Sequence, residues 1–114
     1  MKEKIGEVFS IAKDNQTIAG CTISKAIQEG RNPIIYFSLA ADTDISAEVF
    51  PYHKLIVVAE GSLEVYGDNH YVRTLTAGDS IVTLTDTPMG MRTTSGAIYT
   101  EVEIQKEDIM NSVI

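Results

Sequence analysis

The sequence contains little of what several classes of protein require. Its 114 residues include a single cysteine, Cys21, so no disulfide can form within the chain and no second thiol lies at metal-binding spacing. We interpret Cys21 as a packed thiol in a reducing compartment. No run of about 18 apolar residues is present, and the opening MKEKIGEVFSIAKDNQ lacks the apolar segment of a signal peptide. We therefore expect an uncleaved cytoplasmic protein without a membrane span.

Basic residues are also scarce. Nine Lys and Arg stand against sixteen Asp and Glu, which gives a formal net charge of −7. Binding to a phosphate backbone needs concentrated positive charge, and this chain would repel it. We expect no nucleic-acid partner.

Helical periodicity is nearly absent, apart from the tail QKEDIMNSVI, where Asp108 could cap one short turn. Short runs rich in β-branched and aromatic residues recur instead, separated by breaks of hairpin length that contain Gly, Asp, Asn and Ser. These runs predict strands at 7–11, 17–27, 33–40, 45–50, 54–60, 62–67, 71–76, 80–85 and 97–104. The sequence thus predicts an all-β, antiparallel sandwich or barrel, with residues 1–114 forming a single domain.

One of these runs, KLIVVAE at 54–60, is apolar on both faces of the predicted strand. A strand that is apolar on both sides is usually covered on both. We expect a second copy of the chain to cover its outer face.

Two short patterns in VVAEGSLEVYGDNHYVRTLTAGDSIVTL resemble the conserved motifs of the cupin superfamily. Glu60-Gly61 matches the Glu-Gly turn of the first cupin motif, and Gly78-Asp79 matches the opening of the second. Pro88-Met89 then aligns with the Pro-His pair that follows. The resemblance extends over most of the chain and implies a jelly-roll β-barrel with its core at about 33–104. The amino-terminal strands in 7–27 would add to the barrel or to a dimer.

The resemblance also places four residues where metal-binding cupins carry their histidines and glutamate, namely Glu48, Phe50, Lys54 and Met89. A divalent metal needs several N, O or S donors, whereas Phe50 offers none and Lys54 brings a repelling cation. We interpret the metal site as lost and expect no cofactor. His53 is one residue from the aligned position and should face the other way, and His70 should lie exposed at the rim of the barrel.

We predict that Glu48, Phe50, Lys54 and Met89 instead bind a ligand, and we assign no catalytic residue. Lys54 would either anchor an anionic group or form an ion pair with Glu48, two alternatives that the sequence leaves open. Surface ion pairs are the favoured interpretation for Arg73 and Arg92.

The function predicted from the sequence is metal-independent binding of a small molecule inside the barrel of a homodimer. Two alternatives remain. One is a metal-dependent isomerase, lyase or dioxygenase acting on a small carbohydrate or organic acid. The other is a sensor or accessory subunit without catalysis.

Overall fold

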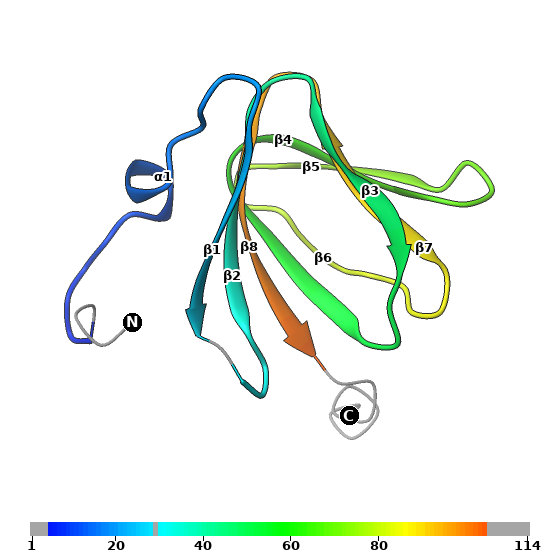
Figure 1. Cartoon of the computed structure of the whole chain (residues 1–114), viewed down its shortest axis with the longest axis horizontal. Coiled ribbons are helices and arrows are strands. Elements are labelled where there is room, and N and C mark those ends of the chain that lie inside the picture. Colours follow the sequence, from blue (N-terminus) through cyan, green and yellow to red (C-terminus); the bar gives the residue numbers. More distant parts are fainter. Residues whose placement is uncertain (1–4, 29, 105–114) are drawn as a thin grey trace.

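The computed structural model describes residues 5–28 and 30–104 and consists mainly of strands (Figure 1). The described elements are α1 (Ile11–Asp14), β1 (Thr22–Gln28), β2 (Ile34–Leu39), β3 (Thr43–Val49), β4 (His53–Gly67), β5 (Val72–Thr76), β6 (Ser80–Val82), β7 (Pro88–Thr93) and β8 (Ala97–Ile104). Every strand pairing is antiparallel, which confirms the predicted fold class. The helical turn considered near Asp108 lies outside the described residues.

The strands form two layers that share the long strand β4. Its first half pairs with β8 and β6, and through β8 the layer continues to β2 and β1. Its second half pairs with β5 and β7, and β3 completes that layer beside β7. In Figure 1 the layers diverge toward the end of the molecule at which β4 begins. The fold is therefore a curled antiparallel sheet, and we call the end at which its two layers diverge the open end.

A glycine allows β4 to serve both layers. The backbone at Gly61 has φ of +84°, the register slips between Val58 and Glu60, and a side chain at Gly61 would overlap the carbonyl oxygen of Gly96. The sequence predicted a break between two strands at Glu60-Gly61. That prediction is wrong, because the positive φ bends the strand without reversing it.

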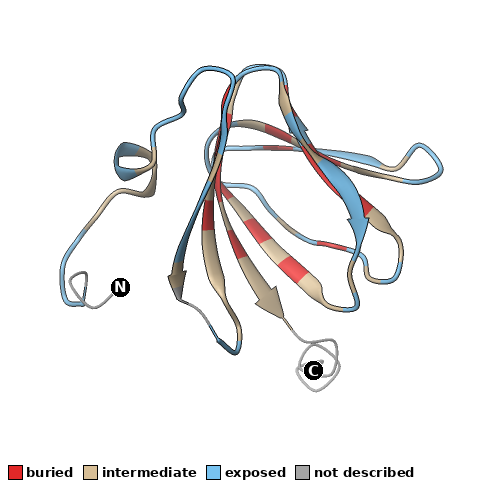
Figure 2. Cartoon of the chain, in the orientation of Figure 1, coloured by how far each residue is buried: buried red, intermediate tan, exposed pale blue. Residues whose placement is uncertain are grey.

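The core lies between the two layers, and its positions follow the alternation of each strand. On the first half of β4, Lys54, Ile56 and Val58 are buried, while Leu55 and Val57 between them are only partly covered. Figure 2 shows the buried positions gathered where the layers face each other. The core cluster comprises Leu39, Ile56, Val58, Leu63, Val65, Leu75, Met89, Met91, Ala97 and Tyr99.

The structure contains a strand, β7, that the sequence did not predict. Pro88 and Gly90 weaken the strand signal at this point, yet each has a structural reason. Pro88 is the first residue of the strand, and a Cβ on Gly90 would collide with the ring of Tyr66 on β4. The glycine therefore gives the neighbouring tyrosine room to pack.

The amino-terminal segment also differs from the prediction. Residues 7–10 form no strand, and Ser10 caps α1 by accepting a hydrogen bond from the Lys13 backbone amide at 3.2 Å. β1 begins only at Thr22 and pairs with β2, so part of the predicted strand at 17–27 is confirmed. Cys21 is exposed, which contradicts its interpretation as a packed thiol.

This amino-terminal segment covers part of the outer face of the first layer. The Ser38 hydroxyl donates to the carbonyl of Asn15, and α1 contacts β4 and β8. Ser38 and its cross-strand partner Ile98 are only 2% exposed although neither belongs to the core between the layers. The chain itself thus supplies some of the cover expected from a second copy. No described helix is long and apolar enough to cross a bilayer.

Candidate functional site

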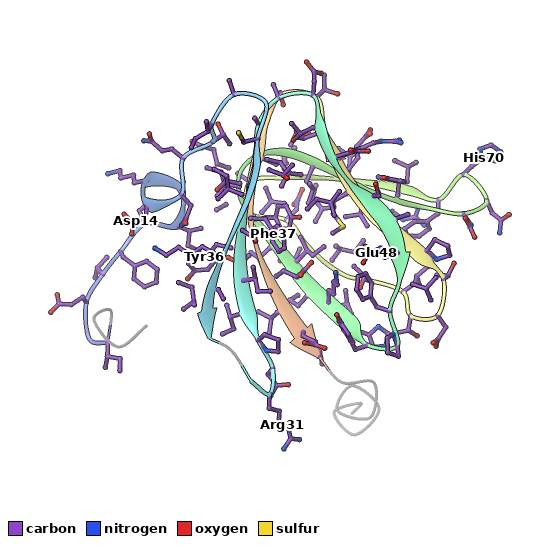
Figure 3. All side chains as sticks on the ribbon, in the orientation of Figure 1. Asp14, Arg31, Tyr36, Phe37, Glu48 and His70 are labelled. Atoms are coloured by element: carbon purple, nitrogen blue, oxygen red, sulfur yellow. The ribbon has the colours of Figure 1, made fainter. Side chains whose placement is uncertain are left out.

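The four residues predicted to bind a ligand form two contacting pairs, Phe50 with Lys54 and Glu48 with Met89. Lys54 is buried at the start of β4, and the ring of Phe50, in the loop before it, has its centroid 3.7 Å from the Lys54 Nζ. Glu48 on β3 is paired with Met89 on β7 in the antiparallel register. Met89 is buried, whereas Glu48 is exposed at the rim. Figure 3 shows the side chains that project between the layers, with Glu48 labelled on β3.

The partner of Lys54 is Glu101 on β8 and not Glu48. The Lys54 Nζ lies 3.3 Å from the Glu101 Oε1, and the two residues are 9% and 7% exposed. The strand register explains this contact. Glu103 of β8 lies opposite Lys54 of β4, and Glu101 lies opposite Ile56, so Glu101 is a diagonal neighbour of Lys54. The diagonal neighbours on one face of an antiparallel pair are within reach of long side chains.

Burial raises the pKa of the Glu101 carboxyl above its ordinary value, and the attraction of Lys54 partly opposes that rise. The Lys54 ammonium lies within ion-pair and hydrogen-bond distance of the Glu101 Oε1 and thus satisfies that oxygen. The buried hydroxyl of Tyr99, on the same face of β8, has no hydrogen-bond partner among the described residues. Burial, with a further contribution from Glu101, raises the Tyr99 pKa well above 10.0.

Aromatic rings lie close to this pair. Tyr99 stacks on Phe37 of β2 with 5.1 Å between the ring centroids, and Phe50 lies 5.3 Å from the ring of Tyr52. The pKa of Tyr52 is raised, chiefly by burial and then by the carboxylates of Glu103, Glu101 and Glu48. The open end therefore combines one ammonium group with several carboxylates and flat apolar surfaces.

The two histidines do not converge on this cluster. His53 faces away from Lys54 by strand alternation, and its Nδ1 donates to the Thr83 carbonyl at 2.6 Å. His70 is exposed, with φ of 62°, in the turn between β4 and β5. Across residues 5–28 and 30–104, no group of three His, Cys, Asp or Glu side chains could hold a metal ion.

Sequence analysis did not identify Glu101 or Tyr99. In AIYTEVEI the odd positions from Tyr99 to Glu103 alternate with Ile98, Thr100 and Val102, so either face could have been the inner one. Only the packing of β8 against β4 turns the polar face inward.

No protein-family model and no curated protein sequence matches the chain. Solved structures do match its fold. A conserved protein of unknown function from Streptococcus pyogenes superposes with a TM-score of 0.80 at 17% identity, covering 88% of each chain. A cupin superfamily protein from Desulfitobacterium hafniense also reaches 0.80, at 14% identity over 89% of this chain and 93% of the other.

A third match is an uncharacterised conserved protein with a double-stranded β-helix domain from Klebsiella pneumoniae. Its TM-score is 0.73 at 20% identity, over 86% of this chain and 89% of that one. At such low identities these likenesses establish a shared fold, and the chemistry has to be argued from the side chains.

Proposed function

Since this chain has the fold of the small cupins, we propose that it binds a small organic molecule at the open end of its barrel without a metal ion. Phe50, Lys54, Met89 and, at the rim, Glu48 would contact the ligand. Glu101 joins this set as the partner of Lys54. Tyr99 joins it because its hydroxyl is buried beside Glu101.

The observation that carries the proposal is the buried Tyr99 hydroxyl, which has no hydrogen-bond partner among the described residues. Buried polar groups are nearly always hydrogen-bonded, and leaving one unsatisfied costs about 1–3 kcal/mol. A ligand that accepts a hydrogen bond from Tyr99 would recover that free energy. The neighbouring ammonium of Lys54 would contact the same ligand.

The surrounding groups suggest the chemistry of this ligand. The rings of Phe50 and Tyr52 and the thioether of Met89 suit an apolar portion of the ligand. An anionic portion would contact Lys54, but it would have to compete with Glu101 for the ammonium group. Protonation of Glu101, which its raised pKa favours, would release Lys54 for such a ligand.

Metal independence is supported by the cation at the centre of the cluster. An ammonium group repels a divalent ion over these short distances, and Phe50 contributes no lone pair. The nearby carboxylates of Glu48 and Glu101 alone do not provide the usual ligand number.

The test combines elemental analysis with native mass spectrometry of the purified protein, before and after incubation with iron, manganese, zinc, nickel and copper. We expect no stoichiometric metal. We also expect a retained organic molecule of constant mass that is lost in the Tyr99→Phe and Lys54→Met variants. About one equivalent of tightly held metal per chain would contradict the proposal and favour the metal-dependent enzyme.

We further propose that the chain forms a homodimer through the outer face of the first layer. Outward residues on four neighbouring strands form one apolar row in register, Ile34 to Val102 to Leu55 to Val82. Val82 is 45% exposed. Sedimentation analysis should show a dimer that Val82→Asp weakens, whereas Val49→Asp on the other layer should not. A monomeric wild type at all concentrations would contradict the dimer.

A further inference from the structure

The side of the barrel contains a groove that lies apart from the Lys54 cluster. A pocket of about 400 Å³ lies between the turn from β4 to β5 and the loop from β6 to β7, and a second of about 390 Å³ lies between β5 and β6. Tyr71 and Arg73 line both pockets. The two hollows therefore meet at this pair of side chains.

Arg73 is held in a defined position at the junction. Its guanidinium carbon lies 4.3 Å from the centroid of the Tyr71 ring, and its Nη1 donates to the Val72 carbonyl at 3.0 Å. Strand register places Arg73 opposite the core residue Val65, so its side chain leaves β5 on the inner face of the sheet. Of the five N–H groups of the guanidinium, most remain available to a ligand.

Comparison with Arg92 shows what is unusual about Arg73. Arg92 also lies over a tyrosine, with its guanidinium carbon 4.7 Å from the Tyr66 ring, but its Nε donates to the Glu64 carboxylate at 2.7 Å. The surface ion pair predicted for Arg92 is thus confirmed. For Arg73 no acidic partner is found among the described residues, and its surface ion pair stays a prediction. An arginine without an acidic partner among those residues is unexpected in a chain with a net charge of −7.

The other charged groups of the groove do not replace that partner. Asp79 lines the second pocket, but its Oδ2 already accepts hydrogen bonds from the amide and hydroxyl of Thr76, at 3.0 and 3.2 Å. Asp68 and His70 both line the first pocket. Arg73 is the charged side chain that lines both pockets.

Apolar side chains form the remaining walls. Leu84, Pro88 and Met89 line the first pocket, and Leu75 and Ile81 line the second. Leu84 is 47% exposed, which leaves its surface open to a partner. The groove therefore offers a fork of hydrogen-bond donors beside apolar surface, a combination that recognises a carboxylate on an apolar body.

We propose that this groove is a second ligand site, distinct from the Lys54 cluster, which binds a small organic carboxylate with a flat apolar body. The carboxylate would form a bidentate contact with Arg73, and the apolar body would lie against Leu84 and Met89. The site does not depend on ligand binding at Lys54. Met89 is the one residue that the two sites share.

The experiment is an NMR titration of backbone amides with benzoate, and with benzamide as its neutral counterpart. We expect saturable shifts at Tyr71, Arg73 and Met89, with benzoate bound more tightly than benzamide. Arg73→Gln should weaken benzoate binding about tenfold or more, because a hydrogen bond to a charged group contributes about 1.5–3 kcal/mol. Arg92→Gln is the matched control and should bind benzoate like the wild type.

Lys54→Met distinguishes this site from the interior one. We expect benzoate to shift the same groove amides in that variant with unchanged affinity. The proposal would be overturned by the absence of saturable shifts in the wild type or by unchanged binding in Arg73→Gln. Shifts centred on Tyr99 and Glu101 that Lys54→Met abolishes would assign the carboxylate to the interior site instead.

Discussion

The ammonium nitrogen of Lys54 lies 3.3 Å from a carboxylate oxygen of Glu101, and both side chains are buried between the two layers of the barrel. Removing two charges from water offsets much of their attraction, so a buried pair contributes little net stability compared with apolar residues of similar volume. Loss of one partner destabilises the fold, because it leaves the other charge buried without a counter-charge.

Lys54→Met should therefore lower the free energy of unfolding by about 3–5 kcal/mol at neutral pH. The double variant Lys54→Met with Glu101→Leu should recover most of that loss, since neither charge remains. Urea denaturation of the wild type, both single variants and the double variant gives the coupling free energy directly. Additive single effects would contradict a direct interaction.

The pH dependence of stability should reveal the raised pKa of Glu101. Because the folded pKa lies above the ordinary value of 4.5, the folded chain takes up this proton before the unfolded chain does. The contribution of Glu101 to the free energy of unfolding should thus rise as pH falls from the folded pKa toward 4.5. Comparing the urea midpoints of the wild type and of Glu101→Gln across this pH range isolates the contribution of Glu101.

The rise in the free energy of unfolding on acidification should be larger in Lys54→Met, since this variant lacks the positive charge that lowers the pKa of Glu101. A Glu101→Gln variant whose stability changes with pH in parallel with the wild type would show that Glu101 titrates normally.

Tyr99→Phe should stabilise the protein by about 1 kcal/mol, because it removes a buried hydroxyl that has no hydrogen-bond partner within residues 5–28 and 30–104. It should also weaken the binding of any ligand at the interior site. The Tyr66 hydroxyl donates to the Ile45 carbonyl at 3.4 Å, so Tyr66→Phe is a control that should not stabilise. Thermal denaturation measures both. Equal destabilisation by the two changes would mean that the Tyr99 hydroxyl is satisfied in solution.

Tyr99 should also make the fold sensitive to alkali. Its folded pKa lies well above 10.0, so above that pH the unfolded chain ionises while the folded chain does not. The free energy of unfolding should fall as pH rises past 10.0, and it should fall less in Tyr99→Phe. Identical alkaline profiles for the two proteins would contradict the assignment.

Gly61→Ala should prevent folding or lower the free energy of unfolding by several kcal/mol, since the new methyl group would overlap the Gly96 carbonyl. Gly78→Ala is a matched control. Gly78 also has a positive φ, +93°, but no atom lies within 4 Å of its added Cβ, so only backbone strain of about 1–2 kcal/mol remains. Circular dichroism during urea denaturation compares them. A mild effect at Gly61 would show that the bend of β4 can adjust.

His53→Ala should leave the metal content of the protein unchanged, because the imidazole is bonded to the Thr83 carbonyl on the neighbouring chain segment. The free energy of unfolding of His53→Ala should be about 1 kcal/mol lower than that of the wild type, because the hydrogen bond to Thr83 is lost. Elemental analysis and denaturation test the two statements separately. Loss of a stoichiometric metal in the variant would reveal a site that includes His53.

Local patterns in the sequence were sufficient for much of the architecture. The period-two runs and short polar breaks determined an antiparallel all-β fold, because side-chain alternation and turn chemistry are local properties. The resemblance to the cupin motifs placed Lys54 inside, and strand alternation then placed His53 on the opposite face. The local pattern failed to predict β7, because Gly90 is explained by its contact with Tyr66, a residue distant in the sequence.

Tertiary structure alone decided the composition of the candidate sites. Glu101 meets Lys54 only because β8 returns beside β4. Arg73 lies in a groove formed by β5 and the segments that follow it, without an acidic partner in the part of the chain that the structure describes. Strand alternation predicts which residues of one strand share a face. Which strands become neighbours depends instead on how the whole chain buries its apolar side chains. The sequence by itself thus determined the kind of sheet and the inward position of Lys54. The folded chain decided which distant side chains face Lys54 and Arg73.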